Sequence, residues 1–187
     1  MANAVNLPGN RLAGLITDLM QKIRDGVRTL DELALFLQGK NPFEKTVLAQ
    51  YFATRKGLYV NESFARKILP FAKAEGLADI TKVSYVNLPK NMNDSEIIAQ
   101  HLGGIEEAKK NALTLNQVRT FLDNQWNGED GPLLVDGCAD IFYVLGVEGV
   151  LFAVGAGRRG GRWDMCGWTL GERGRWGAGR RVFRNKV

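Results

Sequence analysis

The sequence has few of the residues that build disulfide frameworks, metal centres and histidine-dependent active sites. Its 187 residues include two cysteines, Cys138 and Cys166, and one histidine, His101. A small secreted protein that relies on disulfides usually carries more cysteines, and a zinc site made of cysteines alone needs four. We therefore expect two reduced, partly buried thiols, no metal site and no cofactor.

Long apolar runs are also missing. A membrane-spanning helix needs about 20 apolar residues, and the longest candidate, residues 144–154, is interrupted by Gly146, Glu148 and Gly149. The opening stretch MANAVNLPGN has no basic segment followed by an apolar one, so we expect no secretory signal there. These absences predict a cytoplasmic protein with no membrane partner.

Charge is present but unevenly distributed. The chain is 45% hydrophobic, which predicts a sizeable core, and its net charge is +5. Residues 128–156 form an acidic block, whereas residues 157–187 hold eight arginines and one lysine against two acidic residues, a balance of +7. The acidic residues of the block are Glu129, Asp130, Asp136, Asp140 and Glu148. This local segregation carries more information than the total.

The first part of the chain has helical periodicity. Apolar residues recur at helical spacing from Leu12 to Ile23, and further helices are expected from Thr29, Pro42 and Asn61. Pro70 should kink or shorten the last of them. Residues 1–78 are therefore predicted to form a helical domain.

The pattern changes to sheet in the second part. ITKVSYVNL (80–88) is rich in β-branched and aromatic residues, and a short helix is expected after Asn93. Strands are also expected at residues 140–145, 150–154, 162–170 and 181–184. Residues 79–187 are therefore predicted to form an α+β domain. The expected fold class is α+β, with a helical N-terminal half, a small mixed segment and a C-terminal antiparallel β-meander.

Two stretches in different halves of the chain look alike. RTLDELALFLQG (28–39) and LTLNQVRTFLDN (113–124) both place a threonine three residues before Glu or Gln, at Thr29 and Glu32 and at Thr114 and Gln117. This spacing is typical of a capping box, in which the two side chains bond each other's backbone amides. Shared capping chemistry explains the likeness, and we favour it over duplication of a module, which remains the alternative.

Several longer segments resemble those of known but uncharacterised proteins. They are ITKVSYVNLPKNMNDSEIIAQHLGGIEEAKKNALTLNQVR, NGEDGPLLVDGCADIFYV and the ending RWGAGRRVFRN. Residues 79–187 are similar to a set of uncharacterised proteins from uncultured, small-genome bacteria. The resemblance implies that the C-terminal part is a recurring module, and it brings no activity and no site residues with it.

Patterns for catalysis are weak. Cys138 or Cys166 with His101 could supply a thiol and a base, but neither cysteine lies in a nucleophile motif. Paired carboxylates could act in glycoside hydrolysis, and Glu129, Asp130, Asp136 and Asp140 are candidates by number alone. A hydrolase is therefore our third hypothesis, and we expect a protein that is not an enzyme.

Two other patterns suggest ligand-binding loops or helices. GAGRRGG (155–161) is glycine-rich but lacks the Gly-Lys-Ser/Thr of a phosphate-binding P-loop, so we expect a flexible turn. The helices expected from Pro42 and Asn61 could form a helix-turn-helix, although their connection is long and Pro70 interrupts the second helix.

The C-terminal tract of arginines and aromatic residues is the strongest functional feature. Arginine forms bidentate contacts with phosphate, and exposed aromatic rings stack on unpaired bases. The residues predicted to bind nucleic acid or another polyanion are Arg158, Arg159, Arg162, Trp163, Trp168, Arg173, Arg175, Trp176, Arg180, Arg181 and Arg184. As a structural alternative, the aromatic residues form a core and the arginines pair with the acidic block.

The preferred hypothesis is thus a non-enzymatic binding protein whose partner is RNA, DNA or another polyanion. The alternative hypothesis is a protein–protein interaction module that uses the helical half or a sheet edge. The sequence identifies neither the ligand nor the oligomeric state.

Overall fold

The computed structural model describes residues 17–18, 20–25, 44–72 and 78–186. The chain divides into two compact units, residues 1–43 and residues 44–187. In the first unit, residues 17–18 and 20–24 are helical, within the first expected helix. The helix expected from Thr29, with its capping box, lies outside the described residues.

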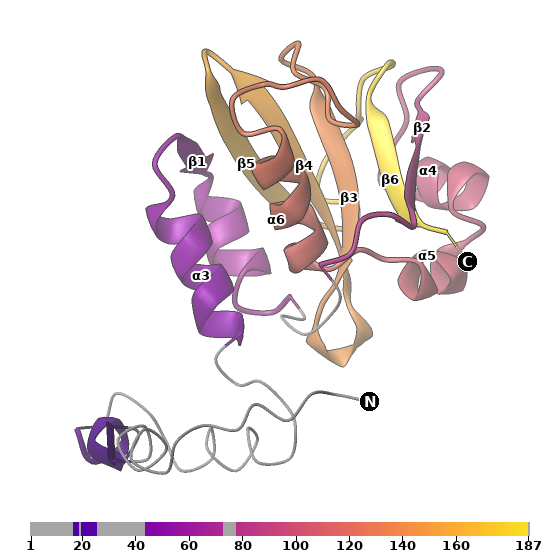
Figure 1. Cartoon of the computed structure of the whole chain (residues 1–187). Coiled ribbons are helices and arrows are strands. Elements are labelled where there is room, and N and C mark those ends of the chain that lie inside the picture. Colours follow the sequence, from indigo (N-terminus) through magenta and orange to yellow (C-terminus); the bar gives the residue numbers. More distant parts are fainter. Residues whose placement is uncertain (1–16, 19, 26–43, 73–77, 187) are drawn as a thin grey trace. The chain divides into compact units, whose positions relative to one another are not determined.

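The second unit is built on one mixed six-stranded sheet (Figure 1). Its strands are β1 (Leu58–Val60), β2 (Val83–Asn87), β3 (Ala139–Leu145), β4 (Leu151–Arg159), β5 (Arg162–Thr169) and β6 (Arg181–Asn185). Their order across the sheet is β1-β5-β4-β3-β6-β2. The pairs β1–β5 and β3–β6 are parallel, and the other pairs are antiparallel.

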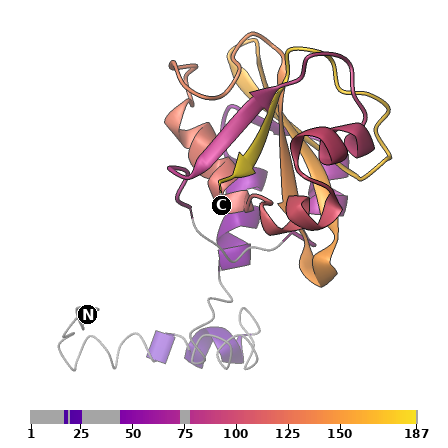
Figure 2. The same cartoon turned by 90° about the vertical axis from the view of Figure 1, so that its right-hand side faces the viewer.

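Helices cover both faces of this sheet (Figures 1 and 2). They are α3 (Glu44–Thr54), the π-helical turn η1 (Phe64–Ile68), α4 (Asp94–His101), α5 (Ile105–Lys110), α6 (Leu115–Asn124) and the short 3-10 turn η2 (Val147–Gly149). One face, which we call the α6 face, packs against α3, η1 and α6. The opposite face, which we call the α4 face, packs against α4, α5 and Trp176.

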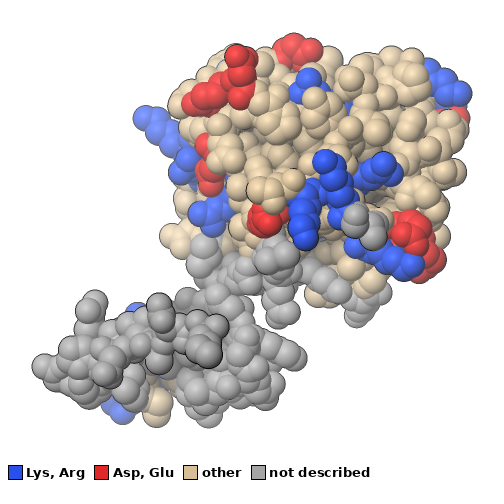
Figure 3. All heavy atoms as spheres, turned by 45° about the vertical axis from the view of Figure 1, so that its right-hand side comes forward, with Lys and Arg blue, Asp and Glu red and all other residues tan. Residues whose placement is uncertain are grey.

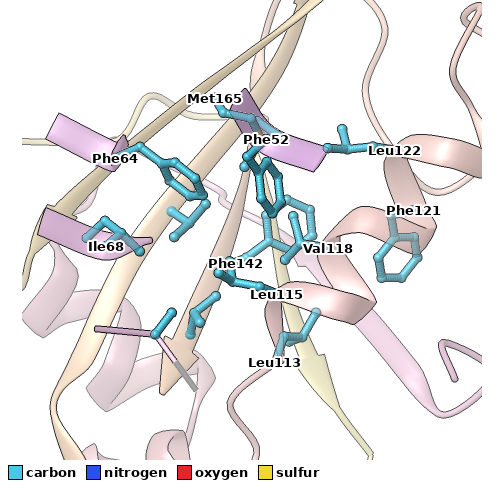
Figure 4. Packing of buried hydrophobic residues seen from close by; sticks show 14 of the residues in the cluster. Phe52, Phe64, Ile68, Leu113, Leu115, Val118, Phe121, Leu122, Phe142 and Met165 are labelled. Atoms are coloured by element: carbon cyan, nitrogen blue, oxygen red, sulfur yellow. The ribbon is translucent and has the colours of Figure 1, made fainter. Parts of the chain in front are cut away.

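The larger core lies on the α6 face. Figure 4 shows Phe52 of α3 and Phe64 of η1 close to Phe142 of β3. Phe142 stacks on Phe183 of β6 at 4.8 Å between ring centroids, which ties β3 to β6. Fully burying one such ring stabilises the fold by roughly 1.5–3 kcal/mol.

The α+β class is what the structure shows, and the expected antiparallel meander is present from β3 to β5. The expectation is wrong for β6, which pairs in parallel with β3 and antiparallel with β2. After β5 the chain crosses the α4 face, where Trp176 is buried, and returns beside β3. A tertiary contact, rather than a local turn, therefore places the last strand.

The segment before Ala78 also differs from the predicted helical domain. β1 pairs with β5, and Phe52 and Phe64 are core residues, so residues 44–72 belong to the same compact unit as the sheet. The boundary between units lies after Phe43, whereas the sequence predicts one near Ala78. The helix-turn-helix prediction is wrong as well, because a strand separates α3 from η1.

Local capping chemistry gives the helix starts that the sequence predicts. Thr114 N–H donates to Gln117 Oε1 over 3.0 Å, and Gln117 N–H donates to Thr114 Oγ1 over 3.1 Å. Asn93 and Glu96 make the same reciprocal pair at the start of α4. Each box satisfies two amides that the first helical turn leaves without partners.

The glycine-rich segment forms more strand than expected. β4 continues through Gly155 to Arg159, and the turn is confined to Gly160 and Gly161, whose φ angles are +55° and +81°. A two-residue turn with two positive φ angles matches the twist of a hairpin. Position 155 within the strand suits glycine, because a Cβ there would lie 3.0 Å from Cys166 Sγ and 3.2 Å from the Trp176 ring.

Candidate functional site

The alternation of β5 decides which predicted residues share a face. Trp163 and Met165 are buried in the core on the α6 face. Because successive side chains point to opposite faces, Arg162 and Trp168 lie on the α4 face. By the same rule Arg159 of β4 lies on the α4 face, directly opposite Arg162 across the hairpin.

Arg173 and Arg180 come to the same face from the connection between β5 and β6. The Arg173 guanidinium carbon lies 4.1 Å from the centroid of Trp176 and 4.5 Å from that of Trp168. The guanidinium carbon of Arg180 lies 5.6 Å from the centroid of the Trp176 ring. Burial, and then the charge of Arg180, lower the pKa of Arg173. We call Arg159, Arg162, Arg173 and Arg180 the arginine surface.

Two of these arginines form no ion pair with a described residue, although the charge of the buried Asp94 acts on Arg173. None of the ion pairs among the described residues includes Arg173 or Arg180, whereas Arg162 Nε lies 3.2 Å from Asp164 Oδ1. Arg173 Nε is buried and has no hydrogen-bond acceptor within the described structure. Two guanidinium groups over one indole therefore keep most of their capacity to bind an anion.

A buried carboxylate holds this arrangement in place. Asp94 begins α4 and accepts hydrogen bonds from Trp176 Nε1 at 2.8 Å, Tyr143 Oη at 2.9 Å and Gly171 N at 3.2 Å. The helix N-terminus also favours a negative charge there. Asp94 thus fixes the connection that carries Arg173.

A small pocket adjoins Arg159 of the arginine surface. Its volume is ≈ 200 Å³, and its lining includes Tyr59, Gly157, Arg159, Asp164 and Cys166. Burial raises the pKa of the Cys166 thiol, while the charges of nearby arginines lower it in part. This environment makes Cys166 a weak nucleophile at neutral pH.

The tryptophans differ from the prediction. Trp163 and Trp176 are each 0% exposed, so the expectation that they are free to stack on bases is wrong. Trp163 belongs to the core on the α6 face, and Trp176 fills the space that Gly155 leaves on the α4 face. Trp168 is half-buried and remains at the surface beside Arg173.

The other four predicted arginines contact different groups. Arg158 is on the α6 face, and Arg175 Nη2 lies 3.4 Å from Glu96 Oε1. Arg181 Nη1 donates to Pro132 O over 2.5 Å, and Arg184 Nη1 donates to His101 O over 2.8 Å. These arginines therefore serve mainly to join segments of the fold.

The C-terminal arginines form no ion pair with the acidic block among the described side chains, although the charge of Arg158 acts on Glu129 and that of Arg181 acts on Asp140. None of the described ion pairs joins Asp136 or Asp140 to a C-terminal arginine. On the face shown in Figure 3, basic side chains lie singly and in small groups, with acidic side chains near several of them. That face carries no uninterrupted basic surface.

The candidate catalytic residues do not form a site in the part of the chain that is described. His101 Nε2 is buried without a hydrogen-bond partner, and Cys166 Sγ contacts Gly155 O at 3.4 Å. Glu129, Asp130 and Asp136 are exposed, whereas Asp140 is fully buried. Three or more His, Cys, Asp or Glu side chains suited to a metal ion do not gather anywhere among the described residues.

Asp140 is the most perturbed carboxyl in this group. Burial raises its pKa to about 8, although the charge of Arg181 and a hydrogen bond from Leu134 N lower it. Its Oδ1 atom is buried and has no partner within the described structure. The charge of the exposed Asp136 raises this pKa further, and no hydrogen bond joins the two carboxyl groups in the described structure.

A second cluster of arginines and aromatic rings was missed by the sequence analysis. Arg55 lies over the rings of Trp126 at 4.4 Å and Tyr51 at 5.5 Å, and Arg119 lies over Tyr51 at 4.7 Å. Asp123 accepts hydrogen bonds from Tyr51, Arg55 and Arg119. Tyr51, Arg55, Arg119 and Trp126 border a hollow of ≈ 480 Å³. The Arg119–Asp123 spacing is the one signal in the sequence, because the other contacts are tertiary.

Comparisons of the chain with protein-family models, curated proteins and solved structures give no match. Among the described residues, no helix has both the length and the apolar character needed to cross a membrane.

Proposed function

We propose that this protein binds nucleic acid or another polyanion through the arginine surface on the α4 face. The convergence of Arg173 and Arg180 on Trp176 carries the proposal, because neither has an ion-pair partner among the described residues. Two like charges held together near a buried ring are costly unless an anion neutralises them.

The chemistry of these side chains suits phosphate groups. A guanidinium group donates hydrogen bonds in a rigid fork that matches two oxygens of a phosphate. The half-buried Trp168 offers an aromatic ring next to Arg173, where an unpaired base could stack. Arg159 and Arg162 extend the positive charge along the same face to the hairpin tip.

Single-stranded nucleic acid is the form of polyanion that this surface fits best. The aromatic group and the small pocket favour unpaired bases, whereas a duplex hides its bases. Because binding to phosphates releases counterions, the affinity should fall steeply as salt rises.

Fluorescence anisotropy with labelled single-stranded RNA and DNA at several salt concentrations tests the proposal. The Arg173→Ala/Arg180→Ala variant should weaken binding at least tenfold. The matched control, Arg66→Ala/Lys82→Ala, removes the same charge away from the surface and should weaken binding less. Arg173→Lys/Arg180→Lys keeps the charge but not the fork, and should fall between wild type and the alanine variant.

Two results would overturn the proposal. One is the absence of binding at low salt by a wild-type protein with a cooperative thermal transition. The other is an equal loss in the Arg173/Arg180 variant and in the control, which would mean that total charge rather than this surface determines binding.

The alternative, a protein–protein interaction, has a different observation in its favour. β2 forms one edge of the sheet, and no strand among residues 44–72 and 78–186 pairs with its outer side.

A further inference from the structure

The outer edge of β2 presents backbone groups in a definite pattern. Lys186 N donates to Lys82 O over 2.7 Å, and Leu88 N donates to Arg180 O over 2.8 Å. In an antiparallel ladder, bonded and non-bonded positions alternate, so residues 82, 84, 86 and 88 bond to β6. The backbone groups of Val83, Tyr85 and Asn87 therefore point away from the sheet.

Five of these six outward groups have no backbone partner among residues 44–72 and 78–186. Val83 N–H donates to Ile80 O over 3.0 Å within the preceding turn. No backbone hydrogen bond of the described residues uses the outward N–H groups of Tyr85 and Asn87 or the outward carbonyls of all three residues. Unpaired edge groups of this kind are a template for strand addition.

β2 lacks the features with which proteins usually protect an edge. Its sequence is VSYVN, with no charged residue and no proline. Lysines, prolines and bulges within the strand are the common protective devices. An edge without them is suited to pairing with another strand.

We propose that β2 pairs with β2 of a second copy of this chain, antiparallel and about a two-fold axis at Tyr85. In this register Tyr85 N–H donates to Tyr85 O of the other copy, in both directions. Asn87 N–H donates to Val83 O of the other copy, again in both directions. The outward N–H groups of Tyr85 and Asn87 in each copy then have acceptors. Val83 supplies only its carbonyl, because its own N–H already donates to Ile80 O.

The side chains agree with this pairing. Tyr85 is 40% exposed, and its ring packs 5.4 Å from that of Phe183 and beneath Arg181. On the two-fold axis the two Tyr85 side chains become a cross-strand aromatic pair. Because the strand is uncharged, like charges do not face each other within it. The pairing joins two sheets into one, which is an isologous contact.

The first test is the mass of the full chain by light scattering and sedimentation over a range of concentrations. The wild type should move from 20.7 kDa toward twice that mass as concentration rises. Asn87→Pro removes an outward N–H without touching a bond to β6, and should shift the dimer dissociation constant at least tenfold. Asn87→Ala keeps the N–H and is the matched control.

Hydrogen exchange of the wild type provides a second test that needs no variant. The amides of Tyr85 and Asn87 should become more protected as concentration rises, while those of Ser84 and Val86 stay protected throughout. A monomer at all concentrations, or equal dimerisation of the proline and alanine variants, would overturn the proposal. Concentration-independent protection of the Tyr85 and Asn87 amides would also overturn it, because a segment of the same chain would then cover the edge.

Discussion

Trp176 Nε1 donates a hydrogen bond to Asp94 Oδ1 over 2.8 Å, and this bond joins the crossing connection between β5 and β6 to the first residue of α4. Both residues are buried, and the same carboxylate oxygen also accepts from Tyr143 Oη. One side chain therefore determines where the chain crosses the α4 face and, with it, where Arg173 lies.

Asp94→Ala should destabilise the protein, because it leaves the Trp176 and Tyr143 donors buried without an acceptor. Each orphaned donor costs roughly 1–3 kcal/mol of the free energy of unfolding. Urea unfolding measures the loss. Asp94→Asn keeps one acceptor oxygen and should lose less than the alanine variant; equal losses would show that the carboxylate oxygens do not hold these donors.

Asp140 should make stability fall as pH rises. Its pKa in the folded protein is about 8, above its ordinary value of 3.8, so the folded state holds a proton that the unfolded state releases. Between pH of about 4 and 8 the free energy of unfolding should therefore drop by up to roughly 1.4 kcal/mol per pH unit from this group. The contribution is complete at low pH and is lost as pH passes through 8.

Asp140→Asn isolates this effect, because the amide stays neutral and its oxygen can still accept from Leu134 N. The difference in stability between the variant and the wild type should grow with pH in favour of the variant. Denaturant unfolding at a series of pH values measures it. A difference that stays constant from pH 4 to 8 would contradict the raised pKa.

Gly155→Ala should destabilise the sheet by roughly 1–3 kcal/mol through overpacking. The added Cβ would lie 3.0 Å from Cys166 Sγ and 3.2 Å from the Trp176 ring, so the Asp94-bound indole would have to move. Gly174→Ala is the control, because a Cβ there meets no atom within 4 Å. Thermal unfolding compares the two; similar melting temperatures would mean that Trp176 adjusts without cost.

Local patterns in the sequence predict local structure well in this protein. The capping box at Thr114 forms as the residue spacing predicts, because both partners lie within one helical turn, and the helix expected after Asn93 forms as α4. The strand expected at residues 162–170 forms as β5, and its alternation separates Trp163 and Met165 from Cys166 and Trp168. These signals depend on backbone geometry that neighbouring residues share.

The alternation of side chains along a strand does not show whether a face of the sheet is buried. This limits how well the sequence predicts which of the predicted binding residues are exposed. Both faces of the central strands are covered, so Trp163 on one face and Trp176 over the other are equally hidden. The parallel position of β6 depends on where Trp176 docks, and the Arg55–Trp126 contact joins segments far apart in the chain. No short-range spacing encodes such contacts.

The two-residue turn at Gly160 and Gly161 has a consequence for how this protein can vary. Arg159 and Arg162 face each other because the turn fixes the register of β4 against β5. Adding or removing one residue at the turn would exchange the faces of β5, moving Arg162 to the α6 face and Trp163 to the α4 face. The tip of the hairpin can therefore vary by substitution, whereas its length is constrained by the packing of the interior.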